Sequence, residues 1–178
     1  MPDPEVIRLA NALRQRLLAL DAEAAAELIQ AYGPIWTELH GRFESLLAEI
    51  EGQQMSFGQV KRLERYQSLL DQMERRIGRF SGVANGIVTD AQAQAVGLAQ
   101  EGVRRTVNAA LPPGISTELL ARVGIDWNVL PSEAFEAFIG MAGDGKPLAR
   151  LLDPLGVGVK TAVRDDIGKG IALGWGPR

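Results

Sequence analysis

Few residues of the types that carry out chemistry occur in this sequence. It has no cysteine and a single histidine, His40. One histidine without cysteine cannot build the usual transition-metal site, and thiolate nucleophiles are excluded as well. His40 follows an apolar residue, Leu39, so we interpret it as a residue at the edge of a helix contact. No nucleophile, base and orienting group can be assembled, so we expect a protein that is not an enzyme and holds no cofactor.

Two polar motifs could bind ions, and each has a simpler interpretation. Asp165-Asp166 is the adjacent carboxylate pair of the sequence. On a helix, neighbours point about 100° apart, so the pair is interpreted as part of a solvated face and not as a metal site. Asp144-Gly145-Lys146 offers an amide-rich turn, but it lacks the glycine pattern of a phosphate-binding loop. We therefore expect a turn there.

Arginine residues form two groups. The first is Arg75-Arg76 with Arg79, and the second is Arg104-Arg105. Because Arg75 and Arg79 lie one helical turn apart, they share a face. The favoured interpretation is a solvated flank paired with nearby glutamates, and the alternative is contact with DNA phosphates or an acidic protein surface. The glutamates considered are Glu64, Glu74 and Glu101.

The three tryptophans are candidates for contact positions. Trp36 lies next to an apolar stripe, so we expect it in a helix core. Trp127 lies in a predicted turn and Trp175 near residue 178. A tryptophan in such a place either anchors a neighbouring element or belongs to an interface, and both interpretations stay open.

Composition limits the class of protein. The 178 residues include 46% hydrophobic residues, enough for a core. With 22 acidic and 19 basic side chains, the formal charge is -3. A general nucleic-acid binder would be basic, so at most local basic groups could contact DNA. We see no secretory signal and no apolar run long enough to span a membrane, so we expect a cytoplasm-like compartment and no membrane partner.

The chain is organised around residues 21–80, which we predict to be two long helices folded back on each other around the loop Glu51–Met55. In each arm, apolar residues recur at steps of three and four, the spacing of a coiled-coil seam. Two stripes joined by a short loop are best buried by antiparallel packing. The first stripe is Leu28, Tyr32, Ile35, Leu39, Phe43, Leu46 and Ile50, and the second is Leu63, Tyr66, Leu70, Met73, Ile77 and Phe80. We expect an elongated, all-α fold built on this hairpin.

Further helices are predicted on both sides of the hairpin. Asp3-Pro4 starts a helix that ends near Asp21 and could lie along the hairpin, and Pro34 kinks the next helix. Ser56 and Gln59 form a capping box for the second arm. From Ser81 to Leu111 the chain is rich in glycine and alanine, which would allow close packing against another helix or a second copy.

Leu111-Pro112-Pro113-Gly114 marks the predicted domain boundary, with a long-helix bundle at 1–111 and a compact module of short helices at 112–178. In the module we expect helices that begin near Ser116 and at Pro131, a helix from Leu148 to Leu155, and a last helix from Lys160 to Leu173. Gly156 and Gly158 are predicted to separate these last two helices.

The last third of the chain resembles the minor head proteins of tailed phages, the head-morphogenesis family related to the F protein of phage Mu. The resemblance lies in the order of four segments. They are Asp126-Trp127-Asn128, Pro131–Phe138, Gly143–Leu148 with Leu151-Leu152, and the closing run Gly170–Arg178. That run is a helix end, Gly-Ile-Ala-Leu-Gly, followed by Trp-Gly-Pro-Arg.

The resemblance implies a structural protein of the inner head near the portal, present in the host cytoplasm during assembly and needed for assembly or for handling packaged DNA. Its implied partners are the portal protein, the major capsid protein, packaged DNA and further copies of itself. Family members continue past the Pro-Arg, so the resemblance implies a fragment, or a processed or partly ordered product.

On this hypothesis the hairpin docks on portal or capsid. We predict partner contacts at Trp127, Trp175 and Arg178. Contacts with DNA or portal are predicted at Arg75, Arg76, Arg79, Arg104 and Arg105. The alternative is a bacterial helical adaptor or regulator that dimerises through the hairpin.

Overall fold

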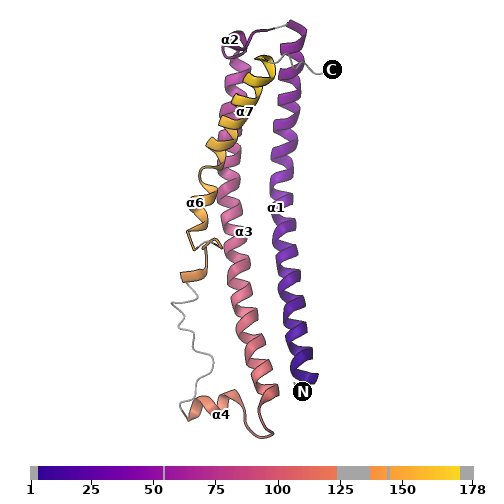
Figure 1. Ribbon diagram of the computed structural model, residues 1–178, viewed down its shortest axis with the longest axis vertical. Helices are drawn as coiled ribbons and strands as arrows, with labels where there is room; N and C mark the ends of the chain where they lie inside the picture. The colour runs from indigo at the N-terminus through magenta and orange to yellow at the C-terminus, as the bar shows by residue number, and fades with distance from the viewer. Residues whose placement is uncertain (1–3, 54, 124–136, 144, 173–178) are drawn as a thin grey trace. The chain divides into compact units, whose positions relative to one another are not determined.

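The computed structural model describes residues 4–53, 55–123, 137–143 and 145–172 of the chain. Within these ranges every regular element is a helix, and no β-strand occurs (Figure 1). The helices are α1 (Pro4–Gln53), α2 (Phe57–Val60), α3 (Glu64–Ala110), α4 (Thr117–Arg122), α6 (Leu148–Leu152) and α7 (Leu155–Ala172). The prediction of an all-α fold with long helices first and shorter helices afterwards is confirmed. Among the described helices, none is long and apolar enough to cross a membrane.

The chain divides into two compact units, each of which combines parts of the long helices with part of the chain after α3. The first unit comprises residues 1–27 and 86–146, and the second comprises residues 28–85 and 147–178. The domain boundary predicted at residues 111 and 112 is a different division, based on composition, and it stays a prediction.

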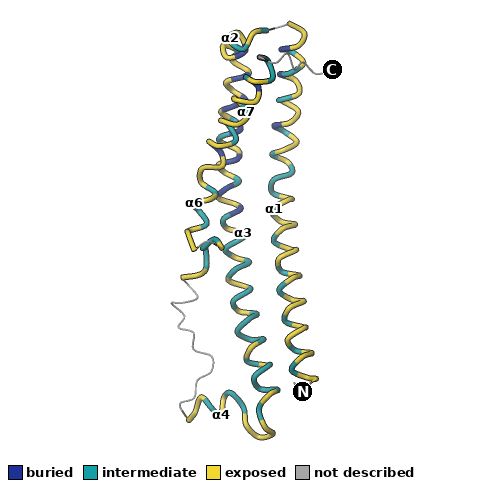
Figure 2. Tube along the Cα trace, in the orientation of Figure 1, coloured by how far each residue is buried: buried dark blue, intermediate teal, exposed yellow. Residues whose placement is uncertain are grey.

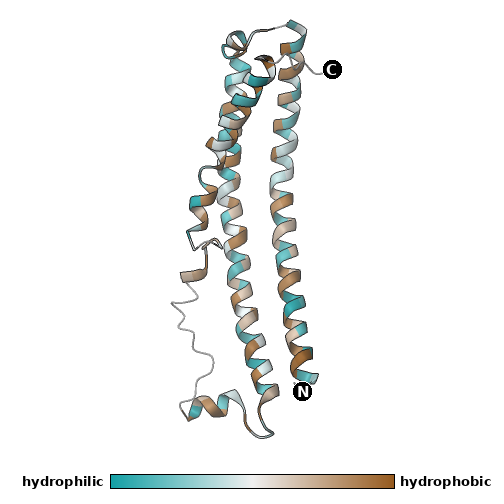
Figure 3. Cartoon of the chain, viewed as in Figure 1, coloured by the Kyte–Doolittle hydropathy of each residue, from teal (hydrophilic) through white to brown (hydrophobic). Residues whose placement is uncertain are grey.

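The predicted seam between the two long helices forms the core of the second unit. In both stripes every residue is buried or half-buried, with Leu46, Tyr66 and Leu70 among the most deeply buried (Figure 2). Figure 3 shows the apolar residues that recur along α1 and α3. Glu38 of α1 pairs with Arg76 of α3, and the Tyr32 ring lies 5.2 Å from the Phe80 ring. From one contact to the next, the α1 residue moves toward the N-terminus while the α3 residue moves toward the C-terminus. The two helices are therefore antiparallel.

Both long helices are continuous where the sequence suggested changes of element. α1 runs through Asp21 and Pro34, so the prediction of a separate first helix ending at Asp21 was wrong. The strong helix formers at residues 22–26 allow the helix to continue past a residue that often caps helices. α3 likewise runs through Ser81, whose hydroxyl donates to the Ile77 carbonyl oxygen at 3.0 Å and is thereby satisfied within the helix.

The connection between the arms is longer than predicted and contains a helix of its own. Gln59 Oε1 accepts a hydrogen bond from the Ser56 backbone N–H at 2.8 Å, as a capping box requires. The box, however, begins the one-turn helix α2, and the second long helix starts only at Glu64. Val60 of α2 is fully buried, so this turn closes one end of the core.

Helix α7 packs on the hairpin through two glycines, and this corrects the predicted start of the last helix. Gly156 and Gly158 lie inside α7, which begins at Leu155, five residues before the predicted start. A Cβ atom at Gly156 would lie 2.6 Å from the Glu74 carbonyl oxygen of α3, and one at Gly168 would lie 2.9 Å from the Phe57 ring. These glycines allow close approach and do not break the helix. Ile167 of α7 completes the core.

The first unit has a looser interior. None of its described residues is fully buried, and its apolar side chains are half-buried or exposed. Leu13 of α1 packs where α3 carries Gly102, whose added Cβ would lie 2.6 Å from a Leu13 methyl group. Ser116 caps α4 by accepting from the Leu119 N–H at 3.2 Å, as predicted for a helix that begins there. The turn predicted near Lys146 is present, because its carbonyl oxygen accepts from the Ala142 N–H at 2.7 Å.

Candidate functional site

The three arginines of the second unit that the sequence singled out, Arg75, Arg76 and Arg79, have different surroundings. Arg76 reaches across the seam and pairs with Glu38 at 3.0 Å, which is not one of the glutamates proposed from the sequence. Arg75 donates from Nε to the Asp71 carbonyl oxygen at 3.1 Å and pairs with no described carboxylate. Arg79 contacts no described hydrogen-bond or ion-pair partner. Arg75 and Arg79 are exposed and one turn apart, so they offer two positive charges to a partner.

The two candidate arginines of the first unit, Arg104 and Arg105, are engaged by acidic side chains. Arg104 pairs with Glu101 at 2.8 Å and with Glu118 at 2.9 Å, and Arg105 pairs with Glu101 at 2.6 Å. Hydrogen bonds from Arg104 and then Arg105 lower the pKa of Glu101. Pairing with Glu101 was the favoured interpretation of these arginines from the sequence. The ion pairs also link α4 to α3 within this unit.

The predicted tryptophan contacts fall into two groups. Trp127, Trp175 and Arg178 lie outside the described residues. Trp36 is described, and its predicted place in the hairpin core was wrong, because it is 55% exposed. The seam positions on either side are Ile35 and Leu39. Trp36 lies about 100° around the helix from Ile35 and about 60° from Leu39, so it lies at the edge of the seam and not within it.

Trp36 belongs to a row of aromatic rings that runs from the seam to His40. Phe80 of α3 lies 5.2 Å from Tyr32, Tyr32 lies 6.4 Å from Trp36, and Trp36 lies 5.3 Å from the His40 ring. His40 is exposed, and its Nδ1 lies 3.5 Å from a carboxylate oxygen of Glu44. The Trp36 ring thus contacts a ring on either side of it while the indole stays at the surface.

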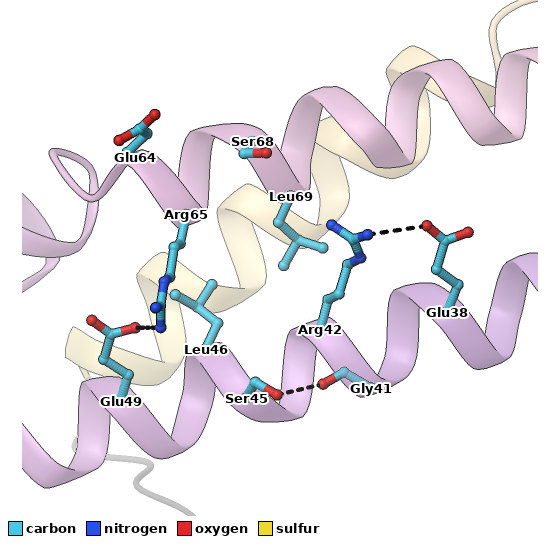
Figure 4. A pocket seen from close by; sticks show the side chains of 10 residues that line it. All are labelled: Glu38, Gly41, Arg42, Ser45, Leu46, Glu49, Glu64, Arg65, Ser68 and Leu69. Carbon is cyan, nitrogen blue, oxygen red and sulfur yellow. Dashed lines mark hydrogen bonds and ion pairs between the residues drawn. The ribbon is translucent and has the colours of Figure 1, made fainter.

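A polar groove lies between α1 and α3 in the second unit. It encloses about 570 Å³ and has Leu46 and Leu69 at its floor (Figure 4). Its rims carry charged pairs: Arg42 contacts Glu38 at 3.3 Å on one rim, and Arg65 of α3 contacts Glu49 of α1 at 3.2 Å across the groove. The small residues Gly41, Ser45 and Ser68 line it as well. Because four of its five charged side chains, all but Glu64, are already paired, this groove offers little to a charged ligand.

A second groove lies between α1 and α7 and is more apolar. It encloses about 540 Å³. Its walls are Phe43, Leu47 and Ile50 of α1 and Val163, Ile167, Gly170 and Ile171 of α7. The charged residues at its edge are Glu51, Asp166 and Lys169, and the last two lie 4.0 Å apart. Apolar walls with a few charges at the edge are typical of a surface that holds a protein side chain.

Sequence reasoning missed this apolar groove, although a signal for it was present. Val159, Val163, Ile167 and Ile171 follow one another in steps of four, the spacing of a helix face that packs on another element. That stripe was obscured because Gly156 and Gly158 were interpreted as breakers of the helix. Once α7 is known to begin at Leu155, the stripe predicts its contact with the core.

One cation holds the other end of α7. Lys160 Nζ contacts Asp71 at 2.8 Å and Glu74 at 2.7 Å, both on α3. The hydrogen bond from Lys160 lowers the pKa of Asp71, and the same pairs raise the pKa of Lys160. All three side chains are partly exposed, so the contact orients α7 more than it stabilises the fold.

The carboxylate pair of α7 has the surroundings of a solvated face. Asp165 contacts Arg164 at 3.1 Å, Asp166 lies near Lys169, and both aspartates are exposed. Within the described ranges, no group of histidine, cysteine and acidic side chains could hold a metal ion. Asp144 of the other polar motif lies outside the described residues.

Comparison with known proteins leaves the phage resemblance as it stood. The chain matches no protein-family model, no curated protein and no solved structure. The link to the head-morphogenesis family therefore stays a prediction based on the segments quoted from the last third of the sequence.

Proposed function

We propose that this chain is a structural protein of a tailed-phage head that works near the portal through protein contacts. Two observations support the proposal. The phage assignment is carried by the ordered motifs of the last third, above all Gly-Ile-Ala-Leu-Gly-Trp-Gly-Pro-Arg at residues 170–178. A role through contacts is supported by Trp36, a large aromatic side chain held at the surface of a long helix.

The proposed partners are the portal protein and the major capsid protein, with packaged DNA as a further partner in the inner head. Of the five arginines considered for such contacts, Arg79 has no carboxylate partner within the described part of the chain, and Arg75 forms no ion pair there, although its charge acts on the nearby carboxylate of Asp71. Two adjacent positive charges on one helix face suit an acidic protein surface or a row of phosphates. Arg76, Arg104 and Arg105 are already paired with glutamates.

The test is a pull-down of the tagged chain from infected or lysogenic cells, read by mass spectrometry. We expect portal or major capsid protein to be recovered. The double variant Arg75→Ala with Arg79→Ala should reduce this recovery several-fold, whereas the matched pair Arg104→Ala with Arg105→Ala should leave it unchanged. Recovery of host proteins alone would contradict the phage assignment.

DNA contact needs a separate measurement on the purified chain. If Arg75 and Arg79 contact phosphates, affinity for duplex DNA falls with salt, and the double variant lowers the salt slope by about two phosphate contacts. An unchanged slope would assign these arginines to a protein partner.

A second candidate is a helical adaptor or regulator of a bacterium that acts as a dimer. It is favoured by the presence, on one helix, of both an exposed indole and an apolar groove. The neighbouring genes distinguish the candidates, because portal and capsid genes next to this one would support the head protein. A dimer that recovers no virion protein would support the adaptor.

A further inference from the structure

Exposed apolar side chains and the apolar groove lie on the same side of α1. Counted at about 100° per residue, Trp36 is within roughly 20° of Ile29 on one side and of Phe43 and Leu47 on the other. Ile29 and Trp36 are exposed, 72% and 55% respectively, whereas Phe43 and Leu47 line the groove against α7. One line along the helix therefore carries a protruding part followed by a hollow part.

The protruding part of α1, residues 28–37, contains no charged residue. Residues 28–37 of α1 include no lysine, arginine, aspartate or glutamate, although nearly three turns of this helix reach solvent there. Residues 80–85, on the neighbouring stretch of α3, are uncharged as well, and Val83 among them is 51% exposed. Apolar surface of this kind on a helix marks an interaction surface.

The hollow part suits an aromatic side chain. The groove walls are aliphatic residues with Phe43, and the volume of about 540 Å³ leaves room for an indole ring. Glu51 and Asp166 at its edge carry carboxylates that can accept a hydrogen bond from an indole N–H. A tryptophan inserted there would bury its ring and satisfy its one donor.

We propose that two copies of this chain pair through α1 in antiparallel orientation, with Trp36 of each copy inserted into the α1/α7 groove of the other. In a two-fold interface each contact occurs twice, so a surface that carries both the protrusion and the hollow is complementary to itself. Trp36 and the groove residue Leu47 are eleven residues apart on α1. The two-fold axis then passes midway between them, beside residues 41 and 42.

The charges along this line also fit a second copy. Around the axis, His40 of one copy lies opposite residues 43 and 44 of the other. The acidic Glu44 thus meets an imidazole and not a second carboxylate. A charged patch that packs against the same patch of a second copy would be repelled by it. The stretch 28–37 carries no charged residue, so it adds no such repulsion. A different protein or a lipid surface could use either the exposed side chains or the groove, but neither explains why both lie on one line of α1.

The first test is the mass of the purified full chain in solution, measured over a concentration series. We expect a dimer, and Trp36→Glu should weaken dimerisation at least about tenfold, as removal of a central aromatic anchor does. Leu18→Glu is the matched control, since Leu18 is 52% exposed on the same helix but belongs to the first unit, outside the paired stretch. It should leave dimerisation within about twofold.

The second test uses the absence of cysteine in the sequence to fix the orientation. Near an antiparallel axis, His40→Cys places two thiols within disulfide reach, so we expect a crosslinked dimer under mild oxidation. Ile29→Cys should not crosslink, because in an antiparallel pair residue 29 of the second copy lies far along the helix from residue 29 of the first. Crosslinking at both positions would overturn the antiparallel arrangement.

A chain that stays monomeric at about 100 µM overturns the proposal, because a dimer with a dissociation constant of about 1 µM would be almost fully formed at that concentration. A dimer that Trp36→Glu leaves intact overturns it as well. Binding of the monomer to lipid vesicles would assign the surface to a membrane. The tests use the purified chain and no virion protein, so their outcome is independent of the proposed role in the phage head.

Discussion

Helix α7 and the stretch of α3 from residue 82 to residue 102 are both rich in glycine, but their glycines have different surroundings. In α7, Gly156 faces the backbone of Glu74 and Gly168 faces the Phe57 ring, each closer than a Cβ atom would tolerate. In α3, no atom lies within 4 Å of a Cβ placed at Gly82, Gly86 or Gly97. Glycine is thus required by packing at Gly156 and Gly168 of α7, as it is at Gly102 of α3, where an added Cβ would meet Leu13. At Gly82, Gly86 and Gly97 it is a pure cost to helix stability.

The contact beneath Gly156 should be the most sensitive point of the comparison. In Gly156→Ala the new methyl group would meet a backbone oxygen at 2.6 Å, and a backbone atom cannot move aside as a side chain does. We expect a loss of about 2 to 3 kcal/mol in the free energy of unfolding, measured in urea.

Gly158→Ala is the control for this substitution. It lies on the same helix, two residues later, with no atom within 4 Å of the added Cβ. It should be neutral or slightly stabilising. Equal destabilisation by both substitutions would show that the loss at Gly156 does not come from its close contact with Glu74.

Tyr66 tests the quality of the core beneath α7. Its side chain is 1% exposed, and its hydroxyl has no hydrogen-bond partner in the described part of the chain. Tyr66→Phe should therefore raise the free energy of unfolding by about 1 kcal/mol, because a buried unsatisfied hydroxyl is removed. A loss of stability would mean that the hydroxyl is hydrogen-bonded to water.

The same residue predicts a pH effect. Burial raises the pKa of Tyr66 above that of the unfolded chain, while the charge of Arg164 opposes the shift. The unfolded chain then loses this proton first, so stability falls as pH rises above about 10. The free energy of unfolding, measured by urea titration at several alkaline pH values, should fall less with rising pH in Tyr66→Phe than in the parent chain.

Substitution of Gly82, a glycine of α3 with no close contact, should change the free energy of unfolding in the opposite direction to substitution of Gly156. Gly82→Ala adds a methyl group to a helix where nothing opposes it, and it should stabilise the chain by about 0.5 to 1 kcal/mol. Thermal unfolding measured by circular dichroism would detect this as a rise in Tm. A fall in Tm would mean that a second molecule approaches this glycine.

The smallest effect is expected at the Lys160 contact. Lys160→Met keeps the side-chain stem but removes the charge that lowers the pKa of Asp71. Asp71 stabilises the fold above its unfolded pKa, and this contribution is lost as pH falls through its lowered folded value. The variant should therefore show a small loss of stability near neutral pH and a flatter decline in acid. Lys169→Met, at a more exposed and more distant pair, should change neither.

The seam of the hairpin could be predicted from the sequence because it depends on spacing alone. Residues such as Leu39, Leu46 and Ile77 recur every three or four positions, and their burial follows from helix geometry. Trp36 could not be placed with the same certainty, because a shift of one residue turns a side chain from the seam to the surface. Helix geometry predicts the line of contact, and the position of each neighbour around that line decides the rest.

The roles of the glycines could not be predicted, because they depend on contacts distant in sequence. The close packing predicted for Ser81–Leu111 was inferred from its small side chains, and the break predicted at Gly156 and Gly158 from the low helix propensity of glycine. Both are local properties of the sequence. Whether Gly156 ends a helix or seats it depends on Glu74, which lies more than eighty residues earlier. The apolar groove has the same origin, since it exists only where α7 meets α1.

The contact between α7 and α3 also has a consequence for the order of folding during synthesis. Arg65 and Glu49, which join the arms of the hairpin, are 16 residues apart, whereas Lys160 is 89 residues from Asp71. At about 5 to 20 residues per second, a ribosome needs roughly 4 to 18 s to make the chain between those two contacts. For that interval the hairpin lacks the cover that Val163, Ile167 and Ile171 of α7 provide, so its apolar face is exposed to solvent until α7 docks.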